Sequence, residues 1–245
     1  MQVEPAKNKA TKSYINAAVE FEKIERILIY LKVSNELINE DFLKSVKKLK
    51  AKNKELELPF EITEKEEKEF LEINYYEKTL SSMMYVKTID NFVNYFKDIL
   101  AEIVIKEPKI LKSKETEQLD FILSFNDYED LINAIAEKKI ESLFYQSIDG
   151  IQKFFREKTG IEIFDNKSNE INLLAKQRNL EVHNRGKISK EFKRQFPNEE
   201  FKENLHLSFD FVYIQKLVPA LYKIVNDLDT KRCTKYHLNE KNFNK

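Results

Sequence analysis

A short stretch of the chain combines a phosphate-binding residue with a proton-transferring one. Arg178 and His183 lie five positions apart, and each is followed by an asparagine, Asn179 and Asn184. Histidine can move a proton near neutral pH because its unperturbed pKa is about 6.5. Arginine keeps its charge and holds phosphate with a planar fork of donors. Cutting RNA without a metal ion needs little more than this pair, and no other segment offers a comparable set.

The pair is expected at the end of a helix spanning about residues 169–184. Ser168 or Asn169 can serve as the N-cap, and Gly186 falls where a helix end favours a left-handed residue. At about 100° per residue, Arg178 lies in the middle of an apolar stripe. The other members of that stripe are Ile171, Leu174, Ala175 and Val182. Because charged groups are rarely buried without a partner, Arg178 should face a partner, a polar cleft or a subunit interface.

Helical phase separates the two candidate groups. Five positions correspond to about 140° around an ideal helix, and Asn179 projects between Arg178 and His183. One straight helix would not aim both groups at the same phosphate. Either the helix end is distorted, or two copies of the helix form a composite site across a dimer axis.

The stretch resembles the Arg-x(4–6)-His motif of the HEPN superfamily, a group of helical domains that includes many prokaryotic ribonucleases. Asn179 matches the polar residue after the arginine, and the Val-His-Asn-x-Gly run from Val182 to Gly186 matches as well. Looser similarity to the branch found in anti-phage and RNA-repair operons covers roughly residues 80–235. Its segments are Ser81 to Ile105, Asn126 to Gly160 and Ser208 to Thr230.

The resemblance implies an up-and-down helical bundle that dimerises and cleaves RNA without a metal or another cofactor. In that scheme Arg178, Asn179 and His183 are catalytic, and a composite site would hold two copies of each. Such enzymes act as toxins or abortive-infection effectors, so an antitoxin or regulatory protein is an expected partner. Some relatives have lost catalysis, which leaves an alternative: a helical module that only binds RNA, a nucleotide or a partner protein.

Composition agrees with an all-α fold. The chain has three glycines and five prolines in 245 residues, too few for a β-rich protein with many tight turns. The glycines are too far apart for a phosphate-binding loop. The single Cys233 fits a reducing compartment, and no signal peptide or membrane-length apolar run is present, so a cytoplasmic location is expected. The motif also lacks the carboxylate cluster that would hold magnesium.

Charge is balanced overall and uneven locally. The 42 basic and 42 acidic residues give a formal net charge of zero, which does not favour binding to nucleic acid by bulk charge. A basic segment nevertheless follows the motif directly. This segment can be a solvated loop, or its residues can contact the RNA backbone. The candidate RNA-binding residues are Asn184, Arg185, Lys187 and Lys190.

Apolar residues recur at helical spacing along most of the chain. The clearest stripe comprises Tyr85, Ile89, Phe92, Phe96, Ile99 and Ile103. We expect an N-terminal helical extension over residues 1–75, a HEPN-like bundle over 76–235 and a C-terminal tail over 236–245. Within the extension, Ser34 and the pair Thr63 and Glu66 are possible helix starts. Asn126 with Glu129 suggests another start, and Gly160 a helix end.

Overall fold

The computed structural model describes residues 9–40, 48, 51–52, 74–144, 148–197, 199–238 and 241–242. These residues form an all-α bundle with one very short antiparallel ladder. The elements are β1 (Lys9–Ala10), α1 (Lys12–Glu40), α4 (Asn74–Lys106), η1 (Pro108–Leu111), α5 (Leu119–Leu123), α6 (Tyr128–Phe144), α7 (Ile148–Phe154), η2 (Phe155–Thr159), η3 (Asp165–Lys167), α8 (Ser168–Asn184), α9 (Lys190–Gln195), α10 (Phe211–Tyr236) and β2 (Lys241–Asn242). None of the described helices is long and apolar enough to cross a membrane.

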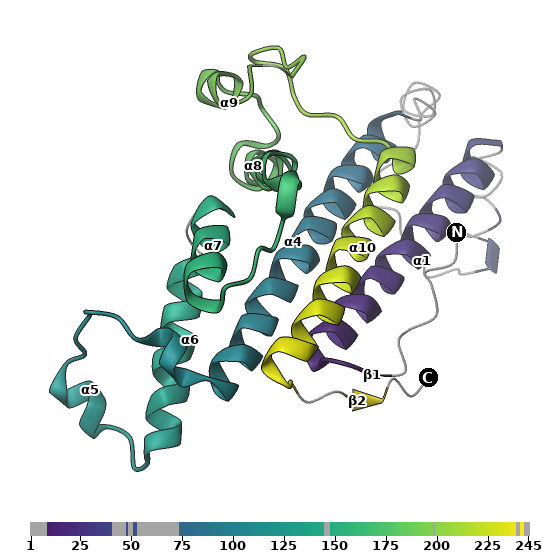
Figure 1. Ribbon diagram of the computed structural model, residues 1–245. Helices are drawn as coiled ribbons and strands as arrows, with labels where there is room; N and C mark the ends of the chain where they lie inside the picture. Colours follow the sequence, from purple (N-terminus) through teal and green to yellow (C-terminus); the bar gives the residue numbers. More distant parts are fainter. Residues whose placement is uncertain are drawn as a thin grey trace.

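Three long helices, α1, α4 and α10, lie side by side and form the centre of the bundle (Figure 1). α6, α7 and α8 pack on the other side of α4, so α4 separates the α1 side of the molecule from the α8 side. The expected stripe on α4 is confirmed, because all six of its residues are buried. α4 therefore carries both the central core and one wall of the region around Arg178.

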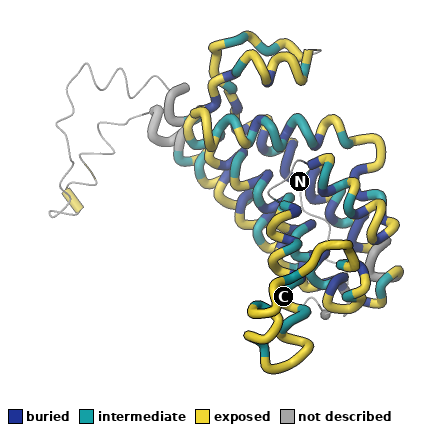
Figure 2. Tube along the Cα trace, turned by 90° about the vertical axis from the view of Figure 1, so that its left-hand side faces the viewer, coloured by how far each residue is buried: buried dark blue, intermediate teal, exposed yellow. Residues whose placement is uncertain are grey.

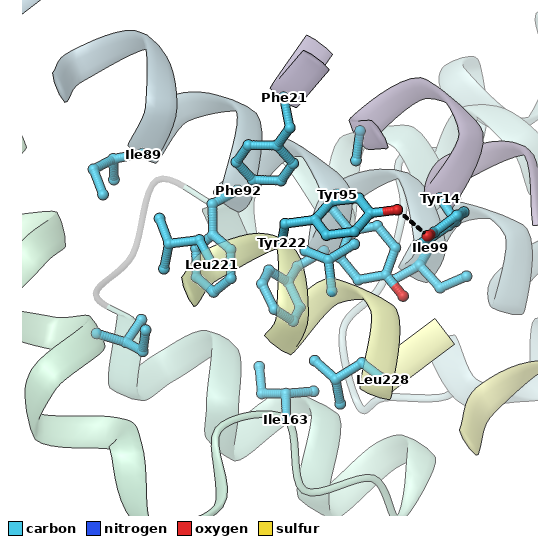
Figure 3. Close-up of a cluster of buried hydrophobic side chains, with 14 of the residues drawn as sticks. Tyr14, Phe21, Ile89, Phe92, Tyr95, Ile99, Ile163, Leu221, Tyr222 and Leu228 are labelled. Atoms are coloured by element: carbon cyan, nitrogen blue, oxygen red, sulfur yellow. Dashed lines mark hydrogen bonds between the residues drawn. The ribbon is translucent and has the colours of Figure 1, made fainter. Parts of the chain in front are cut away.

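One hydrophobic core connects these helices. Buried positions follow the inner faces of the helices, and exposed positions follow their outer faces (Figure 2). Phe21 of α1, Phe92 of α4 and Leu221 of α10 come together in the aromatic and aliphatic cluster of Figure 3. The described part of the expected N-terminal extension thus shares its core with the bundle.

Two carboxylates hold the beginning of α1 in place. The Thr11 hydroxyl donates to the buried Asp229 of α10 over 2.5 Å and accepts from the Tyr14 backbone N–H over 3.0 Å. The Ser13 backbone N–H donates to Glu102 of α4 over 2.7 Å. Because free backbone donors at a helix start need acceptors, these contacts both cap α1 and tie it to α4 and α10.

Replacement of Thr11 by valine is expected to lower the free energy of unfolding by about 2–4 kcal/mol. The change removes a helix cap and leaves the buried Asp229 carboxylate without one donor. Urea unfolding followed by circular dichroism measures the effect. Thr11→Ser keeps the hydroxyl and should recover most of the loss; equal stability of the valine variant and the wild type would contradict this role.

Other expected helix boundaries are adjusted by local capping. α6 begins at Tyr128, and the Asp127 side chain accepts from the Asp130 backbone N–H over 2.8 Å, so Asp127 and not Asn126 caps it. Gly160 follows η2 in the left-handed conformation and ends that helical segment, as expected. The possible helix start at Thr63 and Glu66 lies outside the described residues, and Ser34 lies inside α1.

Candidate functional site

Helix α8 carries the motif and packs on α4 through a buried tyrosine. The Tyr85 hydroxyl lies 2.9 Å from the Leu174 carbonyl and 3.0 Å from Gln177 Oε1, both of which are acceptors. Its ring stacks on Phe209, with ring centroids 4.0 Å apart. Burial raises the pKa of the Tyr85 phenol well above its ordinary value, so the hydroxyl keeps its proton and donates. These contacts fix α8 against α4.

The two ends of α8 differ in how well the sequence indicates them. Gly186 has a φ of 72°, as expected for a helix end, and Arg185 before it is already left-handed with a φ of 52°. The expected N-caps are wrong: α8 begins at Ser168 itself, because the turn η3 leads into it directly. The Ser168 hydroxyl donates back to the Asp165 carbonyl over 3.4 Å and leaves α8 without a side-chain cap.

Arg178 has the kind of partner that its position requires. Its Nε donates to Asp90 Oδ1 on α4 over 2.7 Å, and one terminal nitrogen donates to Asn179 Oδ1 over 3.1 Å. The side chains of Arg178 and Asp90 are 29% and 37% exposed, so the pair lies at the rim of the core. The other terminal nitrogen of Arg178 has no hydrogen-bond partner among the described residues and can receive a phosphate.

The apolar stripe around Arg178 is packed over only part of its length. Ile171 and Leu174 are buried, whereas Val182 is 47% exposed. Gln177, which contacts Tyr85, is buried instead of Val182. The packed face of α8 is therefore rotated away from Val182 at the C-terminal end, and this rotation leaves the helix end open to solvent.

A single cleft of about 690 Å³ collects Arg178, Asn179 and His183. It lies between α4, α6, α7 and α8, and it has both polar and apolar walls. The remaining lining residues are Ile89, Asp90, Val93, Asn94, Lys97, Glu141, Phe144, Ile148, Ile151, Asn172, Ala175 and Lys176. One copy of α8 therefore brings both groups to the lining of one cleft. The expectation that a single helix does not aim both of them at one phosphate stays a prediction.

Helical phase explains how one helix lines the cleft with these groups. Asn172, Lys176, Asn179 and His183 follow one another at steps of four, three and four, so they lie within about 60° on one face of α8. We call these four residues the polar stripe of α8. Arg178 lies about 100° from Asn179, on the side of α8 that faces α4, where it pairs with Asp90 and also lines the cleft.

The charges in the cleft are mixed, with an excess of cations near the motif. Lys97 lies 3.8 Å from Glu141 on α6, and Arg178 pairs with Asp90. Lys176 forms no ion pair with any residue that the structure describes. A phosphate in the cleft would therefore meet the Lys176 ammonium and one guanidinium nitrogen of Arg178, neither of which pairs with a described residue.

The four expected RNA-binding residues lie outside the lining of the cleft. Asn184, Arg185, Lys187 and Lys190 are all exposed, on the segment that leaves the end of α8. The Asn184 side chain donates to the Lys187 carbonyl over 2.6 Å and so shapes this loop. Their role as contacts to the RNA backbone stays a prediction.

Several polar residues of the cleft were missed by inspection of the motif. Asp90, Asn94 and Lys97 lie on α4 at steps of four and three, next to its apolar stripe. That polar line at helical spacing was a signal available in the sequence. Nothing in the sequence shows that it faces Arg178, because the pairing of two helix faces is a tertiary contact.

Comparison of the chain with protein-family models, with curated proteins and with solved structures gave no match.

Glu181 lies on the face of α8 opposite the polar stripe and gives a test by pH. It is half-buried, and burial raises the pKa of its carboxyl, while a hydrogen bond with Ser82 and the nearby His206 lower it; Tyr85 also faces it. The folded state therefore holds the Glu181 proton more tightly than the unfolded chain does. Stability from this group is greatest in acid and is lost as the pH rises above the ordinary value of 4.5.

Replacement of Glu181 by glutamine is expected to remove this dependence. The free energy of unfolding of the variant minus that of the wild type should therefore be larger at pH 7 than at pH 4. Urea unfolding at several pH values measures this difference. The exposed Glu137→Gln on α6 is a matched control with no such trend. An unchanged difference between Glu181→Gln and the wild type across this range would show that the carboxyl is not perturbed.

Proposed function

We propose that the protein is a metal-independent endoribonuclease of the HEPN type. The observation that carries the proposal is the presence of Arg178, Asn179 and His183 in one cleft, with Asp90 holding the arginine. A cation, an amide and an imidazole around one open space are the groups that in-line attack on a phosphodiester needs.

In the proposed reaction, the ribose 2′-oxygen attacks the adjacent phosphorus and the bond to the 5′-oxygen breaks. His183 takes the proton from the 2′-hydroxyl or gives one to the departing 5′-oxygen. Arg178 stabilises the charge that grows on the phosphoryl oxygens. Asn179 orients the guanidinium, with which it shares a hydrogen bond. The products are a 2′,3′-cyclic phosphate and a free 5′-hydroxyl.

The proposal includes a homodimer and a biological role. Val182 beside His183 and Met83 in the N-terminal half of α4 are exposed apolar side chains that a second copy could cover. In a two-fold dimer the two His183 side chains could serve as base and acid. We further propose that the enzyme acts as a toxin or anti-phage effector and that a partner protein restrains it.

The proposal is tested with single-stranded RNA, the matched DNA and excess EDTA. We expect the wild type to cut the RNA in EDTA, to leave the DNA intact and to produce 2′,3′-cyclic phosphate ends. Loss of cutting in EDTA, or equal cutting of DNA that lacks the 2′-hydroxyl, would overturn the mechanism. Binding of RNA without any cutting would instead favour a non-catalytic RNA-binding module.

A further inference from the structure

A second cleft of about 660 Å³ adjoins the first and shares two lining residues with it, Asn172 and Lys176. It lies where α8 meets α7 and the segment after α9. Its other lining residues are Asp149, Asn169, Glu170, Leu173, Gln195, Phe196, Pro197 and Glu199. The polar stripe of α8 therefore runs from His183 in the first cleft to Asn172 at the border of the second.

The second cleft is suited to a nucleobase and unsuited to a phosphate. Its three carboxylates, Asp149, Glu170 and Glu199, would repel a phosphate but can accept hydrogen bonds from amino groups. Phe196 supplies a half-exposed ring, and Phe192 supports it with ring centroids 5.1 Å apart. Aromatic rings of this kind stack with unpaired bases.

Asn172 adds a hydrogen-bond acceptor that no described residue uses. Its Oδ1 is buried and receives no hydrogen bond from the described residues. An unpaired buried acceptor costs free energy, so rotation of the amide toward a ligand amino group loses nothing and gains a hydrogen bond.

Lys176 lies between the two clefts and forms no ion pair with the described residues. It precedes His183 by seven positions, which is about 10 Å along the helix axis and on the same face. Because Lys176 lines both clefts, a phosphate bound there would lie between the base in the second cleft and the phosphate bound in the first cleft.

We propose that the second cleft is a base-binding subsite for a nucleotide adjacent to the cleavage point, and that Lys176 binds the phosphate between the two clefts. The inference rests on the proposed RNA substrate. Because the cleft offers acceptors, it selects bases with an exocyclic amine, such as adenine and cytosine, over uracil.

The test uses fluorescein-labelled, 2′-O-methylated hexamers of A, C or U, which the enzyme cannot cut, and measures binding by fluorescence anisotropy. Phe196→Ala should weaken binding about 5- to 100-fold, as loss of one stacked base would. Phe196→Tyr should retain binding and shows that the fold is intact. Lys176→Ala should weaken binding and lower the salt dependence by about 0.7. Phe121→Ala on α5 and Lys153→Ala on α7 are matched controls at residues that line neither cleft.

Tighter binding of A and C hexamers than of U, together with the two losses, would support the subsite. Wild-type affinity in both Phe196→Ala and Lys176→Ala, or equal affinity for all three hexamers, would overturn it even if the enzyme cuts RNA. If the variants lose affinity as expected but the wild type leaves RNA uncut, the subsite stands and the proposed function falls.

Discussion

Replacement of Arg178 by alanine is expected to slow RNA cleavage by about 100- to 1,000-fold. The guanidinium is held by Asp90 and Asn179, so its remaining donors are aimed before the substrate arrives. A preorganised donor of this kind stabilises the charge that develops on the phosphoryl oxygens more than it stabilises the ground state. The effect should appear in the single-turnover cleavage rate, with RNA affinity changed much less.

Arg178→Lys separates charge from geometry. Lysine keeps the charge but not the planar fork that binds Asp90 and a phosphate together, so its rate should lie between those of the alanine variant and the wild type. Arg156→Ala, an exposed arginine of η2, is the matched control and should cleave as the wild type does. Wild-type rates in Arg178→Ala, with normal circular dichroism, would remove Arg178 from the mechanism.

Replacement of His183 by alanine is expected to slow cleavage by about 100- to 10,000-fold, because the step loses its proton carrier. The His183 side chain is exposed at the end of α8, so the change should leave the fold intact. Added imidazole can enter the open cleft and should restore part of the rate. His206→Ala, an exposed histidine outside the cleft, should cleave normally. Unchanged cleavage by His183→Ala would rule out this role.

The sequence indicates the helices well because their signal is local. The stripe from Tyr85 to Ile103 has the helical period over its whole length, and all six positions are buried. The signal for the end of α8 is likewise local, since the left-handed Arg185 and Gly186 follow its last residue. Its beginning is not, because the turn η3 continues into the helix and replaces a side-chain cap.

The site is only partly visible in the sequence. The motif indicates Arg178, Asn179 and His183, but the 140° between arginine and histidine suggests that they point apart. All three nevertheless line one cleft: Asn179 and His183 are only about 40° apart around α8, and Arg178 pairs with Asp90 at the α4 wall of the cleft. That Arg178 and His183 reach the same phosphate stays a prediction. Asp90 lies 88 positions before Arg178 in the sequence, and no local pattern pairs the two residues.

The same limit applies to the arrangement of the helices. Residues 9–40 carry a helical pattern that does not show where α1 belongs. Its place is set by contacts such as Thr11 with Asp229, which joins positions 218 apart in the sequence. The core of the bundle therefore extends to the first described helix, and the expected boundary near residue 75 falls at the start of α4.

Whether Arg178 and His183 act together in one cleavage step is measured most directly by a double-mutant cycle. Single-turnover RNA cleavage is compared for the wild type, Arg178→Ala, His183→Ala and the double variant, all purified in the same way and assayed in EDTA. Groups that serve one step in one cleft are strongly non-additive, so we expect the double variant to be little slower than the slower single variant. Losses that simply multiply, or cleavage by the double variant at the wild-type rate, would contradict a shared site.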